Sequence, residues 1–248
     1  MLAIIGGSGL TQLPNLEVTR REIMRTPYGD PSGAITFGTI RGAPVAFLAR
    51  HGYGHTIPPH KVNYRANIWA LNQHAVKYIV SVASVGSIRA DLGPGALAVP
   101  DQIIDYTYGR EFTYFHGDDR SVVHVDFTQP YCETLRQRLL RAAGEAGEPV
   151  VAGGTYAATQ GPRLESAAEI DRFERDGADM VGMTGMPEAA LARELGLCYA
   201  AVAVIVNRAA GRADSATGIK LADINAVSRG ALARVHKIID CLVTLDGD

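Results

Sequence analysis

Residues 2–10 read Leu-Ala-Ile-Ile-Gly-Gly-Ser-Gly-Leu, a short apolar run that ends in a cluster of glycines. Such a run is typical of a buried strand that ends in a tight turn, so we expect a strand at residues 2–5. Glycines let backbone N–H groups approach an anion, and Ser8 adds a hydroxyl group, which makes residues 6–10 a candidate phosphate-binding loop. The loop has neither the Lys-Ser/Thr of a Walker motif nor the GxGxxG order of a dinucleotide motif. A purely structural turn is the alternative.

Outward from this stretch, apolar segments of strand length alternate with segments of helical periodicity. Strands are expected at 34–40 and 44–49, as a hairpin around Arg41-Gly42, and at 78–83, 96–104, 153–159 and 198–206. Helices are expected at 63–74, 131–147, 167–175, 185–195 and 222–242, and a long functional loop at 106–128. The alternation predicts an α/β fold with a central mixed, twisted β-sheet flanked by helices. Because no linker or repeat is visible, we expect residues 1–248 to form a single domain.

The composition favours a cytoplasmic enzyme. A chain of 248 residues can bury a sizeable core without disulfides or metals. The net charge of −2, without a run of Lys or Arg, argues against a nucleic-acid partner. No segment has the roughly 18 apolar residues of a membrane helix, and the first residues lack a basic n-region, so no membrane partner is expected. Cys132, Cys198 and Cys241 are widely spaced, and we expect buried thiols in a reducing compartment.

Three further segments place polar residues at strand ends or at a helix start. Arg50-His51-Gly52 follows a strand, and a guanidinium can bind two phosphate oxygens while the imidazole donates once more. Ser84-Val85-Gly86-Ser87 lies at a strand end, where open α/β sheets bind ligands. The segment 183–188 opens a helix, whose free N–H groups favour an anion. For Met183 alone, packing in the core is the alternative.

Three nearby histidines, His51, His55 and His60, are the candidate metal ligands. Their spacing of four and five residues fits no standard zinc motif, so we expect no metal. We expect structural roles for His55 and His60.

Taken together, these motifs resemble the trimeric purine nucleoside phosphorylase family, and most closely its methylthioadenosine phosphorylase branch. The resemblance runs from residue 4 to about residue 207 and rests on residues 6–10, 50–52, 55–67, 86–89, 161–163, 177–180, 183–184 and 187–188. It implies the nucleoside phosphorylase fold and a homotrimer with active sites at subunit interfaces. It also implies a pentosyltransferase reaction in which inorganic phosphate is a co-substrate and no cofactor is needed.

The same resemblance assigns roles to individual residues. It implies that phosphate contacts Ser8, Arg50, His51, the backbone at Ala83 and Ser84, and Thr184. Met183 is then expected under the ribose. His124 is expected to reach a neighbouring subunit of the trimer and to close the 5′ side of its sugar.

Two positions depart from the adenine-reading branch, which carries an Asp-x-Asp pair where this chain has Asn207-Arg208-Ala209. An Asn amide offers a donor as well as an acceptor, which suits a purine with an oxygen at C6. Glu165, directly after Leu164, stands where that branch has a small hydroxyl residue, and the 6-oxopurine branch uses a Glu to accept N1–H. We expect Asn207 and Glu165 to act on the base, with Leu164 beside them. The alternatives are a favourable carboxylate at a helix start and a turn residue.

The 5′ side of the nucleoside is expected to carry a methylthio group. Ordinary 6-oxopurine nucleoside phosphorylases hold a 5′-hydroxyl with a His, but the His that follows Asn207 here is His236 in the last helix, and the nearer candidates Ile219 and Leu221 are apolar. The expected reaction, in purine and methylthio salvage, converts S-methyl-5′-thioinosine and phosphate to hypoxanthine and 5-methylthioribose 1-phosphate. The alternatives are phosphorolysis of methylthioadenosine or of inosine and guanosine, and a non-catalytic nucleoside-binding protein.

Overall fold

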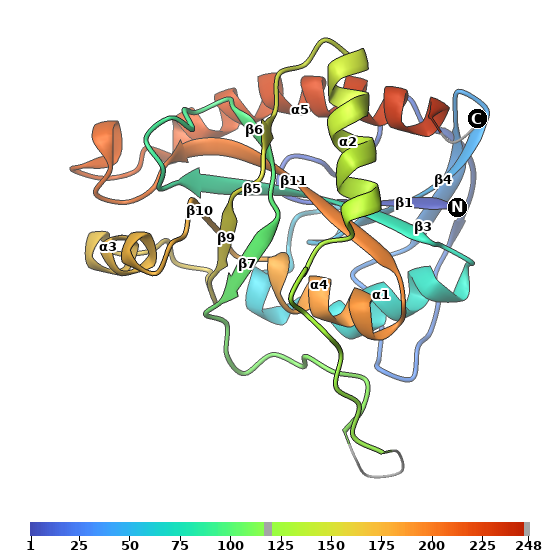
Figure 1. Cartoon of the computed structure of the whole chain (residues 1–248). Coiled ribbons are helices and arrows are strands. Elements are labelled where there is room, and N and C mark those ends of the chain that lie inside the picture. Colours follow the sequence, from blue (N-terminus) through green and yellow to red (C-terminus); the bar gives the residue numbers. More distant parts are fainter. Residues whose placement is uncertain (117–120, 246–248) are drawn as a thin grey trace.

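The computed structural model describes residues 1–116 and 121–245, which form a mixed sheet with helices on both faces (Figure 1). The α/β fold predicted from the alternating pattern is confirmed. The strands are β1 (Leu2–Gly6), β2 (Glu17–Glu22), β3 (Ile35–Ile40), β4 (Ala43–Ala49), β5 (Tyr78–Ser87), β6 (Leu97–Val99), β7 (Gln102–Asp105), β8 (Val151–Ala152), β9 (Thr155–Ala158), β10 (Met180–Gly182) and β11 (Cys198–Arg208). The helices are α1 (Tyr64–Gln73), α2 (Glu133–Glu145), α3 (Ala167–Arg175), α4 (Gly185–Glu194) and α5 (Leu221–Thr244), with short 3-10 turns η1 (Pro59–Lys61) and η2 (Ala213–Ser215).

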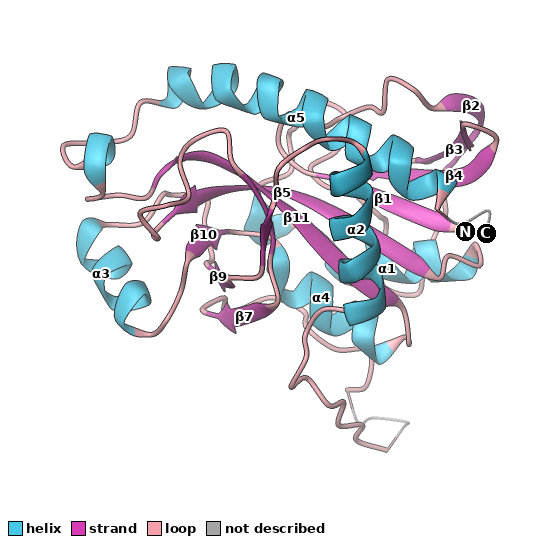
Figure 2. Cartoon of the chain, turned by 45° about the horizontal axis from the view of Figure 1, so that its top comes forward, coloured by secondary structure: helices cyan, strands magenta, loops and turns pink. Residues whose placement is uncertain are grey.

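Different helices cover the two faces of the sheet (Figure 2). Along β1, Ala3 and Ile5 pack into one apolar cluster with residues of α1 and α4. Leu2 and Ile4 pack into a second cluster with residues of α2 and α5. Successive side chains of a strand point to opposite faces, so a strand covered on both faces must be apolar throughout. This confirms the strand predicted from the opening stretch of the sequence.

One edge of the central strand β5 is paired only at its two ends. β11 lies along the whole of the other edge, from Cys198↔Tyr78 to Arg208↔Ser87. On the incomplete edge, β1 is parallel to β5 and its register ends at Ile5↔Ser81, whereas β10 is antiparallel and pairs with Gly86 and Ser87. Within the described residues, positions 82–85 therefore have no strand partner on that edge. Such a gap between diverging strands is where open α/β sheets bind ligands.

Some expected boundaries differ from the structure. The segment Ser84–Ser87, expected to follow a strand, belongs to β5 because its pairing with β11 continues to Ser87. The strand expected at 96–104 is divided into β6 and β7 around Pro100, which has no N–H to donate to a ladder. The strand expected at 153–159 is β9, and β8 precedes it. The exposed strand β2 and the three-residue strand β10 have no strong apolar pattern and were not predicted.

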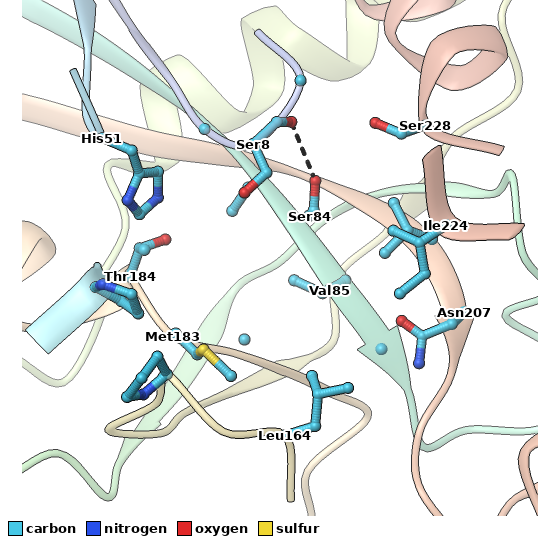
Figure 3. Close-up of a pocket in the computed structure, with 18 of the residues that line it drawn as sticks. Ser8, His51, Ser84, Val85, Leu164, Met183, Thr184, Asn207, Ile224 and Ser228 are labelled. Atoms are coloured by element: carbon cyan, nitrogen blue, oxygen red, sulfur yellow. Dashed lines mark hydrogen bonds between the residues drawn. The ribbon is translucent and has the colours of Figure 1, made fainter. Parts of the chain in front are cut away.

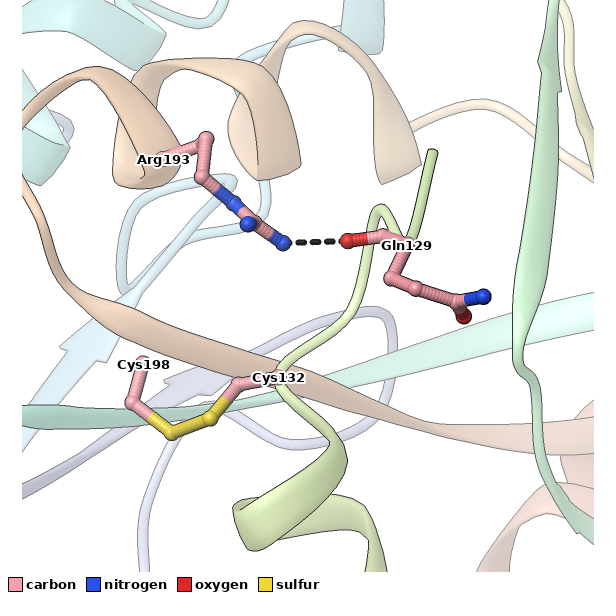
Figure 4. Close-up of a disulfide and its surroundings, with 4 residues drawn as sticks. All are labelled: Gln129, Cys132, Arg193 and Cys198. Atoms are coloured by element: carbon pink, nitrogen blue, oxygen red, sulfur yellow. Dashed lines mark hydrogen bonds between the residues drawn. A yellow bond between two sulfur atoms is a disulfide. The ribbon is translucent and has the colours of Figure 1, made fainter. Parts of the chain in front are cut away.

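Cys132 and Cys198 form a disulfide, so the prediction that all the cysteines are free thiols is wrong (Figure 4). The two residues are 66 positions apart, but their Cα atoms lie within 5.1 Å of each other. The fold brings them together because the backbone N–H of Cys132, just before α2, donates to the carbonyl oxygen of Tyr199 in β11 at 2.7 Å. Their spacing in the sequence contains no trace of this contact. Cys241 is a free thiol.

The segment between β7 and α2 is irregular wherever it is described, as predicted. In the described ranges of the chain, no helix is both long and apolar enough to cross a membrane.

Candidate active site

A pocket of about 920 Å³ opens along the incomplete edge of β5 (Figure 3). It collects most of the side chains that the sequence singled out from separate segments. The predicted site residues that line it are Ser8, Arg50, His51, Ala83, Ser84, Leu164, Glu165, Met183, Thr184, Asn207 and Ile219. In Figure 3, His51 and Thr184 lie at one end and Asn207 at the other, with Val85 and Met183 between them.

The glycine loop after β1 packs closely against the incomplete edge of β5. A Cβ at Gly7 would lie 2.5 Å from the carbonyl oxygen of Val82 and 3.0 Å from Nη1 of Arg50. Gly9 has a φ of +81°, and a Cβ there would lie 3.0 Å from Oγ of Ser228. Side chains are therefore excluded at both positions, and the glycines serve close packing as well as access to the pocket. Ser8 stays exposed between them.

Arg50 is fully buried, and its guanidinium already has a carboxylate partner. Nε and Nη2 donate to the two carboxylate oxygens of Glu188 at 2.7 and 2.8 Å. Nη2 also donates to Oγ of Ser81 at 2.6 Å, and Nη1 donates to the carbonyl oxygen of Val82 at 3.1 Å. Since a guanidinium has five N–H groups, one hydrogen on Nη1 is left for a ligand. The predicted bidentate contact of Arg50 with two phosphate oxygens is thus wrong, because Nε and Nη2 already donate to the carboxylate of Glu188.

Glu188, at the start of α4, is the centre of a buried polar network. Besides Arg50, it accepts hydrogen bonds from Oγ of Ser81 at 2.8 Å and from the hydroxyl of Tyr199 at 2.9 Å. Burial lowers the pKa of the Arg50 guanidinium, but its interactions, led by those with the Glu188 carboxylate, raise this pKa by more. The net pKa is above the usual value, so Arg50 keeps its positive charge beside Glu188. A buried ion pair is tolerated when its remaining polar atoms are hydrogen-bonded, as they are here. Sequence reasoning gave Glu188 no role, because the contact spans 138 positions.

His51 faces the pocket as a neutral imidazole. Nδ1 lies 2.8 Å from the carbonyl oxygen of Ile57, which can only accept, so Nδ1 carries the proton. Burial and the neighbouring Arg50 guanidinium lower the pKa of His51 to about 4. Near neutral pH, Nε2 therefore holds a lone pair. The predicted donor role of His51 is reversed, and the ring offers an acceptor to a protonated phosphate oxygen.

The other two histidines of this segment behave differently from each other. His55 lines the pocket with its ring centroid 4.8 Å from that of His51, although a structural role was expected. His60 is not among the lining residues. Across residues 1–116 and 121–245, no group of three or more His, Cys, Asp or Glu side chains is placed to hold a metal ion.

Met183 and Thr184 occupy the turn between β10 and α4. Thr184 is the buried N-cap residue of α4, and its side chain makes no capping hydrogen bond. In Figure 3 the Thr184 side chain lies at the same end of the pocket as His51, so its hydroxyl can donate to an anion there. The backbone N–H of Thr184 donates instead to the hydroxyl of Tyr156 at 3.3 Å.

Glu165 lines the pocket from the segment before α3. Oγ1 of Thr159 donates to Oε1 of Glu165 at 2.6 Å, which leaves Oε2 for a ligand. Burial raises the pKa of Glu165 above its usual value. The start of α3 is capped instead by Ser166 and Glu169, whose backbone and side chains bond reciprocally. Glu165 is thus not needed as a helix cap.

Asn207 is a strand residue and not a turn residue. It follows a register shift in β11 between Ile205 and Asn207, and a bulge of this kind re-aims a side chain. Its Nδ2 donates to the carbonyl oxygen of Arg208 at 2.5 Å, which leaves Oδ1 and a second N–H available. Asn207 therefore presents both a donor and an acceptor to the pocket.

The N-terminal half of α5 forms a pocket wall that sequence reasoning missed. The lining residues from this helix are Ile224, Asn225, Ser228, Arg229 and Leu232. Their spacing places them on one helical face, but the sequence predicted only a helix at 222–242 and gave it no part in the site. The contact of Ser228 with Gly9, which links the helix to the glycine loop, was not visible in the sequence.

Two predicted site residues are not in this set. His124 is exposed on the segment between β7 and α2 and does not line the pocket of its own chain. Leu221 is the first residue of α5, and its side chain lies outside the described residues.

Comparisons with known proteins agree with this geometry. The model of the family described as the phosphorylase superfamily matches residues 1–244. A relative from Pseudomonas syringae pv. tomato, named probable S-methyl-5′-thioinosine phosphorylase, is 53% identical over 94% of each chain. A relative from Pyrococcus furiosus, named 6-oxopurine nucleoside phosphorylase, is 50% identical over 85% of this chain and 80% of its own. The solved structure of methylthioadenosine phosphorylase from Schistosoma mansoni with adenine superposes with a TM-score of 0.94, at 32% identity, over 99% of this chain and 91% of that one.

Proposed function

This chain belongs to the phosphorylase superfamily, and we propose that it catalyses the phosphorolysis of S-methyl-5′-thioinosine, releasing hypoxanthine and 5-methylthioribose 1-phosphate. One observation carries the proposal: Glu165 and Asn207, from segments far apart in the sequence, line the same pocket. Relatives that carry the names of methylthioinosine and 6-oxopurine phosphorylases support the same class of substrate.

Glu165 and Asn207 match the hydrogen-bonding groups of a 6-oxopurine. Oε2 of Glu165 accepts N1–H, while the Thr159 hydroxyl holds Oε1 in place. Asn207 donates its second N–H to O6, where negative charge collects as the C1′–N9 bond breaks, and the released base anion takes up a proton from water to give hypoxanthine. Neutral adenine has no N1–H, so it leaves the carboxylate of Glu165 without a partner. A buried polar group that loses its partner costs about 1–3 kcal/mol.

At the opposite end, the pocket offers several weak donors to phosphate instead of one strong cation. The hydroxyl groups of Ser8 and Thr184, the backbone N–H of Ser84, and the last Nη1 hydrogen of Arg50 donate to its oxygens. The P–OH of the hydrogen phosphate dianion donates to Nε2 of neutral His51. No metal or cofactor takes part, and phosphate is the co-substrate.

The chemical step needs only these two ends and the sugar between them. A phosphate oxygen attacks C1′ as the bond from C1′ to N9 breaks, and the electron pair of that bond moves into the base. Positive charge develops on the sugar beside the phosphate dianion, and negative charge develops near Asn207. Fixed groups at both ends stabilise this separation without reorganisation, which is the largest source of acceleration in such sites.

The sugar is expected between Met183 and the apolar side chains of Leu164 and Ile219, which favour a 5′-methylthio group. We further propose a cytoplasmic homotrimer in which His124 of each chain reaches the pocket of its neighbour. The exposed position of His124 on the segment between β7 and α2 is compatible with this arrangement.

One observation favours a second candidate, a 6-oxopurine nucleoside phosphorylase. Asn225 and Ser228 of α5 add polar groups to the pocket wall, and these suit a free 5′-hydroxyl. Inosine or guanosine is then the substrate, with the same base contacts.

Steady-state kinetics with phosphate and three nucleosides separate these functions. We expect the highest kcat/KM for methylthioinosine, with methylthioadenosine and inosine both lower by about tenfold or more. A preference for methylthioadenosine would contradict the roles of Glu165 and Asn207, and a preference for inosine would favour the second candidate. The release of no free base in the presence of phosphate would identify a binding protein instead of an enzyme.

A further inference from the structure

Arg110 is a buried arginine that makes no ion pair within the described residues. It lies in the irregular segment after β7, and it is only 8% exposed. All of its hydrogen-bond acceptors are neutral oxygen atoms, and its guanidinium also lies over the ring of Tyr64, with Cζ 5.4 Å from the ring centroid. Its acceptors are the hydroxyl of Tyr64 (3.2 Å), the carbonyl oxygens of Met183 (2.9 Å), Met186 (2.6 Å), Thr159 (3.1 Å) and Gln160 (2.8 Å), and Oε1 of Gln160 (3.1 Å).

Apart from the Tyr64 hydroxyl on α1, these acceptors belong to two segments next to the pocket, 159–160 and 183–186. Thr159 and Gln160 follow β9, and Thr159 also holds Glu165 through its hydroxyl. Met183 lies in the turn that continues into Thr184 at the phosphate end. Arg110 therefore joins the backbone behind the base-reading carboxylate to the backbone behind the sugar and the phosphate.

The guanidinium does not line the pocket, so it acts through the segments that it holds. Its planar group fixes the directions of its N–H donors, and both segments must keep their positions relative to this plane. A lysine at the same place keeps the charge but has three donors around one point, which cannot reach acceptors on both sides in the same geometry. Without the guanidinium, several buried carbonyl groups lose their donor, which drives these segments to rearrange.

We propose that Arg110 is a positioning residue for catalysis, which sets the distance between the base-reading segment and the turn under the sugar. The proposal rests on the proposed function only in that the pocket carries out phosphorolysis of a nucleoside. It does not depend on which purine is cleaved. Misplacement of reacting groups by about 1 Å can cost about 100-fold in rate, so a small shift of either segment is sufficient.

Arg110→Lys tests this role, with Arg136→Lys as the matched control. Arg136 is equally buried, at 7% exposed, and also donates to backbone carbonyl oxygens, those of Pro100 and Val99, but it lies on α2 outside the pocket lining. The measurement is kcat per folded protein, with the nucleoside that the wild type cleaves fastest, together with the melting temperature. The choice of that nucleoside keeps this test separate from the proposed substrate.

We expect Arg110→Lys to lower kcat by about 10- to 100-fold at a temperature where the variant is fully folded. Arg136→Lys is expected to lower the melting temperature without a change in kcat. An unchanged kcat in Arg110→Lys, or an equal loss in Arg136→Lys, would overturn the positioning role.

Gln160→Leu provides a milder test if Arg110→Lys does not fold. It removes Oε1, which accepts from Arg110 Nε and from the backbone N–H of Tyr108, and it leaves the guanidinium and the carbonyl contacts in place. We expect kcat to fall by about fivefold, which corresponds to the loss of about one hydrogen bond to the guanidinium. A kcat equal to that of the wild type would contradict the proposal.

Discussion

The two ends of the pocket are built in different ways. The phosphate end rests on an ionic core, in which Arg50 and Glu188 are both fully buried and joined by two hydrogen bonds. The base end rests on single contacts at partly exposed positions, with one hydroxyl on Glu165 and one carbonyl group on the amide of Asn207.

This difference separates the parts of the site that fix the reaction from those that fix the substrate. A change in the ionic core disturbs the packing of α4 against the sheet, so it affects every substrate and the fold itself. A change at Glu165 or Asn207 alters a few hydrogen bonds and leaves the core intact. Base preference can therefore change without a change in the reaction.

The largest effect is expected from Glu188→Gln. This variant keeps the shape of the side chain but leaves the buried Arg50 charge without a counterion, which costs about 3–5 kcal/mol of stability. Urea denaturation measures this loss, and the ratio of kcat/KM values between nucleosides should not change. The exposed pair of Arg141 and Glu145 is the control, because Glu145→Gln should cost less than about 1 kcal/mol. Equal costs in the two variants would show that the ionic core has no special role.

Asn207→Asp is expected to act on one substrate class only. A carboxylate has no N–H for O6 and repels the partial negative charge there, so kcat/KM for methylthioinosine should fall by about 100-fold, or about 3 kcal/mol. Methylthioadenosine serves as the internal control, since its 6-amino group can donate to the new carboxylate. Equal losses with both nucleosides would mean that Asn207 does not discriminate between bases.

Base preference should also depend on pH. Because the pKa of Glu165 is raised, its carboxylate takes up a proton at a higher pH than a free glutamate does as the pH falls. The protonated form is a weaker acceptor for N1–H of hypoxanthine, and its O–H can donate to N1 of adenine. The ratio of kcat/KM for methylthioinosine to that for methylthioadenosine should thus decrease by about tenfold on acidification. In Glu165→Gln this pH dependence of the ratio should be absent. If the ratio of the wild type does not change with pH, Glu165 does not have the proposed role.

The smallest effect is expected from Thr159→Val, which removes the hydroxyl that holds Glu165 and keeps the side-chain shape. The loss of one hydrogen bond costs about 1 kcal/mol, or about fivefold in kcat/KM for methylthioinosine. Since that bond favours the ionised carboxylate, the pKa of Glu165 should rise further. The pH at which base preference changes should then move upward, and a downward shift would be the wrong sign.

Local patterns in the sequence predicted most of the fold. The strand at 2–5, the hairpin of β3 and β4 and the helix at 167–175 were found because each has its own periodicity and turn residues. The gap in β5 was not predicted, since it depends on where β1 ends relative to β10, and this is a property of pairing between distant strands.

The same limit applies to the site. Most of its residues were identified individually, but the partners that change their chemistry were not. Arg50 was interpreted as a free phosphate ligand because nothing near it in the sequence indicates Glu188. The donor role expected of His51 failed because the carbonyl group of Ile57 and the surrounding burial decide its proton position. In both cases the error came from contacts that only the folded chain makes.

The gap in the edge of β5 has a thermodynamic consequence. Backbone groups of β5 that would hydrogen-bond to a neighbouring strand are left free to bind the anion. On the proposed function, bound phosphate therefore takes the place of the missing strand at this edge. Its binding free energy is then added to the stability of the fold, by about 2.7 kcal/mol at 100 times the dissociation constant. The melting temperature should therefore rise with phosphate concentration in the absence of any nucleoside. The size of this rise reports how much of the protein has phosphate bound at the edge of β5.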